Sequence, residues 1–249
     1  MADNSRIEWT DATWNPTTGC RRVSPGCDHC YAATLAKRLK AMGNRRYQLD
    51  GPDGEGFGLT LHWDKVEEPI TWRRPRRIFV DSMSDLFHPR VSEPFLLRAF
   101  DVMLRCPQHQ FQILTKRPVR MAKVVPRLIE QLGRLPPNVW LGTSIEANEY
   151  TSRADWLRKT PAAIRFLSLE PLLGRMDSLD FTDIDWVIVG GESGPNARPM
   201  SEDWVLDIQA RCQRAGVAFF FKQWGGRTPK AGGRLLAGRT WDEMPIQLR

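Results

Sequence analysis

The sequence of 249 residues predicts a single α/β domain with mostly parallel strands, folded as a partial (βα)6-type barrel or a doubly wound sheet. Three observations lead to this prediction. Short runs that are apolar on both faces alternate with segments of helical periodicity, which is the pattern of βαβ units. No internal repeat and no Pro-, Gly- or Ser-rich linker divides the chain. The length and the 41% content of hydrophobic residues suit one α/β barrel with its own core.

The elements follow one another in a regular order along most of the chain. Strand candidates are residues 12–19, 77–81, 111–115, 139–144, 164–169, 186–190 and 217–222. Helical patterns cover residues 30–42, 92–106, 118–133, 148–159 and 201–216. Ser92 suits an N-cap, Pro118 a first helical turn and Gly133 a helix end. Residues 44–76 are expected to form an irregular insertion, and residues 226–249 a loosely ordered, basic tail.

Polar residues follow the predicted strands at their carboxyl ends. In parallel α/β folds these ends meet at one mouth, where ligands bind. About half of such residues are expected to be helix caps or structural groups. The residues at these positions that we consider as site candidates are Asp81, Ser82, Ser84, Thr115, Lys116, Arg117, Ser144, Glu146, Ser168, Glu170, Glu192, Ser193, Lys222 and Gln223.

The five cysteines divide into a group of three and two isolated residues. Cys20, Cys27 and Cys30 lie within eleven residues, after the first strand candidate and before the first helix. Cys106 and Cys212 lie in helical patterns and are expected in the core. An odd number of cysteines argues against a disulfide framework. Three clustered thiolates favour zinc or an iron–sulfur cluster about equally, and zinc requires a fourth ligand, for which His62 and His88 are the candidates.

The position of the three cysteines resembles the radical S-adenosylmethionine (SAM) superfamily, whose cysteine loop follows the first strand of a partial barrel. Here the spacing is C-x6-C-x2-C instead of C-x3-C-x2-C. The resemblance implies that Cys20, Cys27 and Cys30 hold a [4Fe–4S] cluster with one iron open for SAM. It also places His29 near the SAM adenine. The residues that it assigns to the rest of SAM are Asp81, Ser82, Ser84, Ser144 and Glu146.

A closer resemblance, over most of the chain, is to a phage-associated family of three-cysteine proteins. Four segments carry it: Trp14 to Ala32, Ser168 to Gly174, Trp186 to Gly194, and Phe221 to Gly225. The two resemblances imply an enzyme that cleaves SAM reductively and abstracts a hydrogen atom from its substrate. They imply an electron donor such as a flavodoxin or ferredoxin, and Glu170, Glu192 and Lys222 as candidates for substrate contact or proton transfer.

Two other functions stay open at this point. One is a zinc-stabilised nucleic-acid-binding protein without catalysis. The other is a [4Fe–4S] protein that lacks SAM cleavage. Metal analysis separates zinc from iron and sulfide, and formation of 5′-deoxyadenosine identifies SAM cleavage.

The formal charge of +7 gathers in a few clusters. Their residues include Arg73, Arg74, Arg76, Arg77, Lys116 and Arg117. Such clusters neutralise phosphates, so a nucleic acid or nucleotide is the leading hypothesis for the substrate, against the simpler interpretation of a solvated basic face. No apolar run approaches the about 18 residues that span a membrane, and the first residues lack an apolar signal segment. We therefore expect a cytoplasmic protein with no membrane partner.

Overall fold

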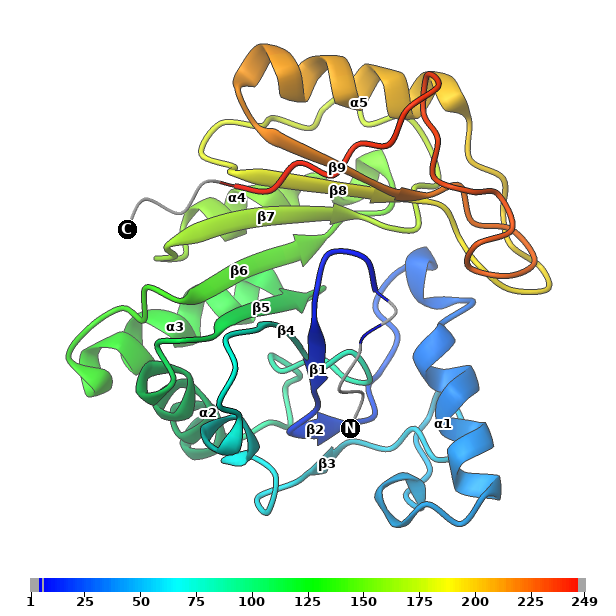
Figure 1. Cartoon of the computed structure of the whole chain (residues 1–249). Helices are drawn as coiled ribbons and strands as arrows, with labels where there is room; N and C mark the ends of the chain where they lie inside the picture. Colours follow the sequence, from blue (N-terminus) through cyan, green and yellow to red (C-terminus); the bar gives the residue numbers. More distant parts are fainter. Residues whose placement is uncertain (1–4, 6, 246–249) are drawn as a thin grey trace.

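Seven parallel strands form the central sheet of the computed structural model, which describes residue 5 and residues 7–245. Their spatial order is β1-β4-β5-β6-β7-β8-β9, so nearly every strand pairs with the next long strand of the chain (Figure 1). The strands are β1 (Ala12–Trp14), β4 (Arg77–Val80), β5 (Gln110–Thr115), β6 (Val139–Ser144), β7 (Ile164–Leu169), β8 (Trp186–Gly190) and β9 (Ala218–Gln223). The prediction of a mostly parallel α/β fold is confirmed.

Helices connect most of these strands; the later four cover the outer face of the sheet, whereas the first lies to one side (Figure 1). They are α1 (Tyr31–Ala41), α2 (Glu93–Arg105), α3 (Pro118–Leu132), α4 (Ser152–Arg158) and α5 (Glu202–Ala215), with short 3-10 turns η1 (Pro25–Cys27), η2 (Arg45–Tyr47), η3 (Glu68–Thr71) and η4 (Asn148–Tyr150). Gly133 and Gly216 end α3 and α5 with φ of 74° and 67°, which glycine adopts without strain. The helix expected over residues 148–159 is divided into η4 and α4.

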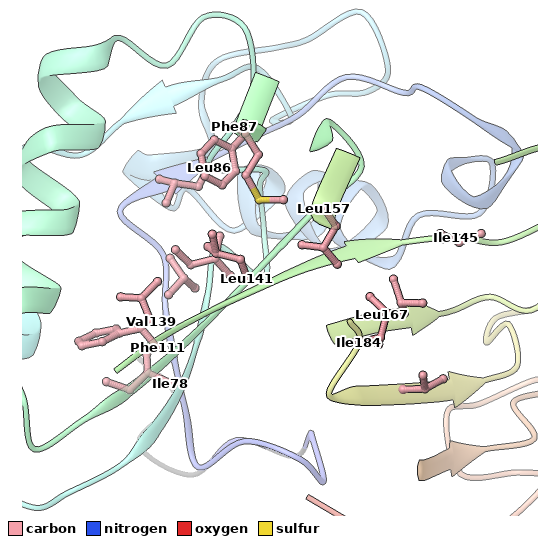
Figure 2. Packing of buried hydrophobic residues seen from close by; sticks show 14 of the residues in the cluster. Ile78, Leu86, Phe87, Phe111, Val139, Leu141, Ile145, Leu157, Leu167 and Ile184 are labelled. Atoms are coloured by element: carbon pink, nitrogen blue, oxygen red, sulfur yellow. The ribbon is translucent and has the colours of Figure 1, made fainter. Parts of the chain in front are cut away.

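Alternating side chains of the strands pack on opposite faces of the sheet. On the outer face, Ile78, Phe111 and Val139 are register partners on three neighbouring strands, and they lie together in Figure 2. They belong to the main hydrophobic core, which includes the buried faces of α2, α3, α4 and α5. The inner face carries a second cluster rich in aromatic residues: Trp9, Phe79, Trp140, Ile164, Phe166, Trp186, Ile188 and Phe220.

Trp9 shows that the sheet is curled into a partial barrel. Its ring lies 4.8 Å from the ring of Phe79 on β4 and 6.0 Å from that of Trp186 on β8. These strands are four positions apart, which in a flat sheet corresponds to about 19 Å. One side chain reaches both because the sheet wraps around it. The aromatic cluster therefore fills the amino-terminal part of the barrel.

The first strand is shorter than predicted. The strand expected over residues 12–19 ends at Trp14, and Thr17–Thr18 form β2, which pairs antiparallel with β3 (Thr60–Leu61) in a separate small sheet. The chain changes direction because Pro16 has no N–H for the ladder, while the Thr17 N–H is bound by the Asp81 carboxylate at 3.0 Å.

The segment after residue 226 is more ordered than the sequence suggests. Leu236 is fully buried, Trp241 is 8% exposed, and the Phe221 N–H donates to the Trp241 carbonyl at 2.9 Å. This packing corrects the expectation of a loosely ordered tail for these residues, whereas residues 246–249 lie outside the described part of the chain. Among the described residues, no helix has the length and apolar character that crossing a membrane requires.

Candidate active site

The three clustered cysteines lie at the carboxyl end of the sheet, on the side to which the arrows of β6 to β9 point (Figure 1). Their loop begins after Gly19, which only glycine suits, since its φ is +80° and a Cβ would meet the Gly58 carbonyl oxygen at 2.2 Å. It continues through η1 and ends at Cys30, the N-cap of α1. Helix α1 packs beside it through a small apolar cluster that includes Ala32 and Ala36.

Cys20, Cys27 and Cys30 line one pocket, are only partly buried, and form no disulfide. Cys106 and Cys212 are buried in the main core, as predicted. Cysteine thiolates are the usual ligands of iron–sulfur clusters, so the three thiols are donors of the kind that such a cluster uses. Within the described residues, no three His, Cys, Asp or Glu side chains converge as a site for a single metal ion. The imidazoles of His62 and His88 do not line the cysteine pocket.

Arg117 connects Cys20 to the carboxyl ends of two strands. Its Nη1 lies 3.4 Å from the Cys20 Sγ and 2.8 Å from Asp85 Oδ2, and its Nη2 donates to the Arg21 carbonyl at 2.7 Å. Burial, and to a smaller extent the Asp85 charge, raise the pKa of the Cys20 thiol to about 12 although the Arg117 charge lowers it. The guanidinium is thus the cation that favours a thiolate at this position.

Glu192 and Arg198 hold the other half of the cysteine loop. Glu192 is nearly buried and accepts hydrogen bonds from Arg198 Nε at 2.9 Å, Arg198 Nη2 at 2.5 Å and His29 Nδ1 at 2.8 Å. Arg198 Nη2 also donates to the Pro25 carbonyl at 2.9 Å. Burial alone would raise the pKa of Glu192, but these hydrogen bonds outweigh it and lower the pKa to about 2. Glu192 therefore anchors the loop.

The residues after β4 are engaged with the chain between β1 and the cysteine loop. Asp81 accepts from the Thr17 N–H at 3.0 Å and the Thr17 hydroxyl at 2.7 Å, and the Ser84 hydroxyl donates to the Gly19 carbonyl at 2.6 Å. The Ser82 hydroxyl lies 3.1 Å from Asn15 Oδ1. Burial raises the pKa of Asp81 to about 8. These side chains fix the loop in place.

Glu146 is covered completely by the cysteine loop. A Cβ on Gly26 would lie 3.1 Å from the Glu146 side chain, which has no exposed surface. Its Oε2 accepts from Arg153 Nη1 at 2.9 Å, and the same nitrogen donates to the carbonyl of the nearly buried Ser144 at 2.8 Å. Its Oε1 has no hydrogen-bond partner among the described residues, so this buried carboxylate is only half satisfied there.

Glu170 and Lys222 form an ion pair at the ends of β7 and β9. Both side chains are about one-fifth exposed, so they remain accessible from the mouth of the barrel. Tyr31 lies close by: its ring is exposed, and its hydroxyl donates to the Ser82 carbonyl at 2.5 Å. Desolvation of that hydroxyl raises the pKa of Tyr31, and the nearby charges of Cys30 and Glu170 raise it further. The pair therefore lies beside the Cys30 end of the loop.

The structure thus brings the predicted site residues around one mouth and gives them different surroundings. Glu170 and Lys222 stay accessible, whereas Asp81, Glu146 and Glu192 serve protein contacts. Sequence reasoning assigned no role in the loop to Arg117 or Arg198. Arg117 lies just after a predicted strand. The rule that places ligand-binding residues at the carboxyl ends of parallel strands therefore also points to it. No local pattern distinguishes Arg198.

The two main basic clusters lie at opposite ends of the sheet. Arg77 begins β4 and pairs with Asp11, and Arg76 stacks over Trp72, so the run from Arg73 to Arg77 lies at the amino end. Lys116 and Arg117 follow β5 at the carboxyl end. The two groups that the sequence offers for contact with a nucleic acid therefore lie at opposite ends of the sheet.

A family model described as "Protein of unknown function (DUF5131)" matches residues 4–245. The chain belongs to the DUF5131 family. No curated protein matches this DUF5131 chain.

Among solved structures, the DUF5131 chain is similar to spore photoproduct lyase complexed with dinucleoside spore photoproduct, with 13% identity and a TM-score of 0.43 over 80% of this chain and 59% of that chain. A cysteine variant of the lyase gives 13% identity and a TM-score of 0.48 over 85% and 63%. Another variant, with bound AdoMet and dinucleoside spore photoproduct, gives 13% identity and 0.44 over 81% and 61%. The DUF5131 chain spans about three fifths of the length of these lyase chains.

Proposed function

We propose that this protein is an iron–sulfur enzyme of the radical SAM kind, in which Cys20, Cys27 and Cys30 hold a [4Fe–4S] cluster and SAM binds beside it. The observation that carries the proposal is the shared pocket of the three thiols at the carboxyl end of a curled parallel sheet. Sulfur donors favour iron–sulfur clusters, and ligand sites of parallel barrels lie at this end. When bound, the cluster and SAM supply one-electron cleavage of the sulfonium and radical chemistry.

The chain's own residues place the reaction and keep water from it. The aromatic cluster around Trp9 and Trp186 fills the barrel below the site, so substrate enters from the carboxyl mouth. Arg117 and the Glu192–Arg198 pair hold the loop at both ends, which preorganises the thiols. Lys222 donates to Glu170 and is the group that holds or moves a proton at Glu170 Oε1.

The roles proposed for the other candidates follow from their surroundings. His29 is 39% exposed and Ser82 is partly exposed, so they remain candidates for direct contact with SAM. Asp81, Ser84, Ser144, Glu146 and Glu192 are engaged in the contacts described above, so we assign them the shaping of the SAM site. A nucleic acid or nucleotide is the proposed substrate class, and a flavodoxin or ferredoxin the proposed electron donor.

The test is anaerobic purification and reconstitution, followed by iron and sulfide analysis and a SAM-cleavage assay with dithionite. The proposal expects about four iron and four sulfide per chain and formation of 5′-deoxyadenosine. Cys106→Ala is the matched control for Cys20→Ala, because both remove one thiol. One zinc per chain with no iron would indicate the zinc-stabilised alternative, and a cluster without 5′-deoxyadenosine would indicate an iron–sulfur protein that does not cleave SAM.

A further inference from the structure

Basic residues gather beside the cysteine loop, in the segments that meet where β5 leads into α3. We call this group the α3 ridge, and its members are Arg21, Arg90, Lys116, Arg120 and Lys123. Arg117 lies among them but is committed to Asp85 and Cys20. The ridge is separate from the arginines at the amino end of β4.

Hydrogen bonds to backbone carbonyls bring the segments that carry these residues together. Arg117 Nη2 donates to the Arg21 carbonyl at 2.7 Å, which brings Arg21 to the start of α3. Arg120 donates to the His88 carbonyl, and to the Val91 carbonyl at 2.5 Å, so it lies against the segment that carries Arg90. Lys123 follows Arg120 by about one helical turn on α3, and these spacings place it on the same side of the helix.

The positive charge of the ridge is not compensated by nearby carboxylates. Asp85 pairs with Arg117, and Glu93 pairs with Arg127. In the part of the chain that the structure describes, no ion pair is found for any member of the ridge. The surroundings of His88 agree with this excess: burial, together with the charges of Arg117, Arg90 and Arg120, lowers the pKa of His88 to about 4, while only the Asp85 charge raises it. The amino-terminal end of α3 adds a partial positive charge to the same group.

We propose that the α3 ridge binds the phosphate backbone of a nucleic acid and leads it to the cysteine pocket. Several uncompensated cations in a row suit a polyanion with regularly spaced charges better than a single free phosphate. Tyr31, which follows Cys30, presents a ring that is 56% exposed and offers a face on which a base stacks. A nucleic acid uses both the row of cations and the exposed ring, whereas an acidic peptide uses only the row of cations. The part of this proposal in which the nucleic acid reaches the cysteine pocket rests on the proposed function, whereas its binding to the α3 ridge does not.

The test is fluorescence anisotropy with a labelled duplex and a labelled single strand over a range of salt concentrations. The ridge variant is Arg90→Ala/Lys116→Ala/Lys123→Ala, whose residues take part in no ion pair among the described residues. The matched control is Arg134→Ala/Lys159→Ala/Arg214→Ala, which removes the same charge from exposed positions outside the predicted basic clusters. Circular dichroism melts verify that both variants are folded.

For wild-type protein, log K on duplex DNA is expected to fall linearly with log salt. The ridge variant is expected to bind at least about tenfold more weakly at about 0.1 M salt, with a slope smaller by about 2.7 for three lost contacts. The control is expected to lose less than about threefold. Equal losses in both variants, no binding by the wild type, or equal competition by polyglutamate would overturn the proposal. Nucleic-acid binding is measured on metal-free and on reconstituted protein. Because only the proposed function requires iron, binding by the metal-free protein tests the ridge separately from the proposed function.

Discussion

Replacing Arg198 by methionine removes the cation that holds the cysteine loop on Glu192 while keeping most of the side-chain volume. The Glu192 carboxylate is 5% exposed, so solvent screens its interaction with Arg198 only weakly. Its pKa of about 2, against an ordinary value of about 4.3, corresponds to about 3 kcal/mol. Removing one partner of a buried pair typically costs about 3–5 kcal/mol, because the remaining charge is unpaired. We therefore expect Arg198→Met to lower the free energy of unfolding by about 3 kcal/mol at neutral pH.

The stability that the Glu192–Arg198 pair contributes depends on pH. The folded-state pKa of Glu192 is below its unfolded value, so the pair contributes stability above about pH 4.3 that is lost as the pH falls toward about 2. Without Arg198, burial raises the pKa of Glu192, and protonation relieves the unpaired charge. The difference between wild type and variant is therefore largest near neutral pH and smaller at about pH 4.

Urea unfolding of the metal-free proteins at about pH 7 and about pH 4 measures this difference. Arg175→Met is the matched control, because Arg175 pairs with Asp177 on the surface, where both side chains are more than half exposed, and its loss should cost less than about 1 kcal/mol. Adding Glu192→Gln to Arg198→Met should recover much of the stability, since no buried charge is then unpaired. A cost below about 1 kcal/mol, or the same cost at both pH values, would refute the reasoning.

Three further predictions concern single sites. Cys20→Ala should abolish iron retention after anaerobic reconstitution, whereas Cys106→Ala should retain wild-type iron, as iron analysis will show; equal loss would contradict the assignment. Burial raises the pKa of Asp81 to about 8, above its unfolded value of about 3.9, so its contribution to stability is lost as the pH rises from about 4 to about 8; Asp81→Asn, a neutral isostere, should flatten the stability profile over this range, and an unchanged profile in urea titrations would contradict this. A Cβ on Gly142 would lie 2.6 Å from a buried ring, so Gly142→Ala should cost about 1–3 kcal/mol of unfolding free energy, while Gly174→Ala, with open space around it, should cost less; comparable costs would refute the packing argument.

The amino-acid sequence by itself determines the class of fold and predicts where the candidate site lies. Strands that are buried on both faces read as short apolar runs, and α-helices read as periodic patterns, so both can be recognised locally. The cysteine grouping is equally local, since Cys20, Cys27 and Cys30 lie within one loop. The rule that carboxyl ends of parallel strands meet also identified Glu170 and Lys222, which form an ion pair at the mouth.

Only the tertiary structure decided what each polar residue does there. His29 and Glu192 are 163 residues apart in sequence, and Cys20 and Arg117 are 97 apart, so no local pattern predicts their contacts. Burial by the cysteine loop makes Glu146 a covered carboxylate, and the curl around Trp9 sets the depth of the mouth. The end of a strand fixes the backbone position of a residue. The segments that pack over its side chain determine the hydrogen-bond partners of that side chain, its exposure to solvent and hence its pKa.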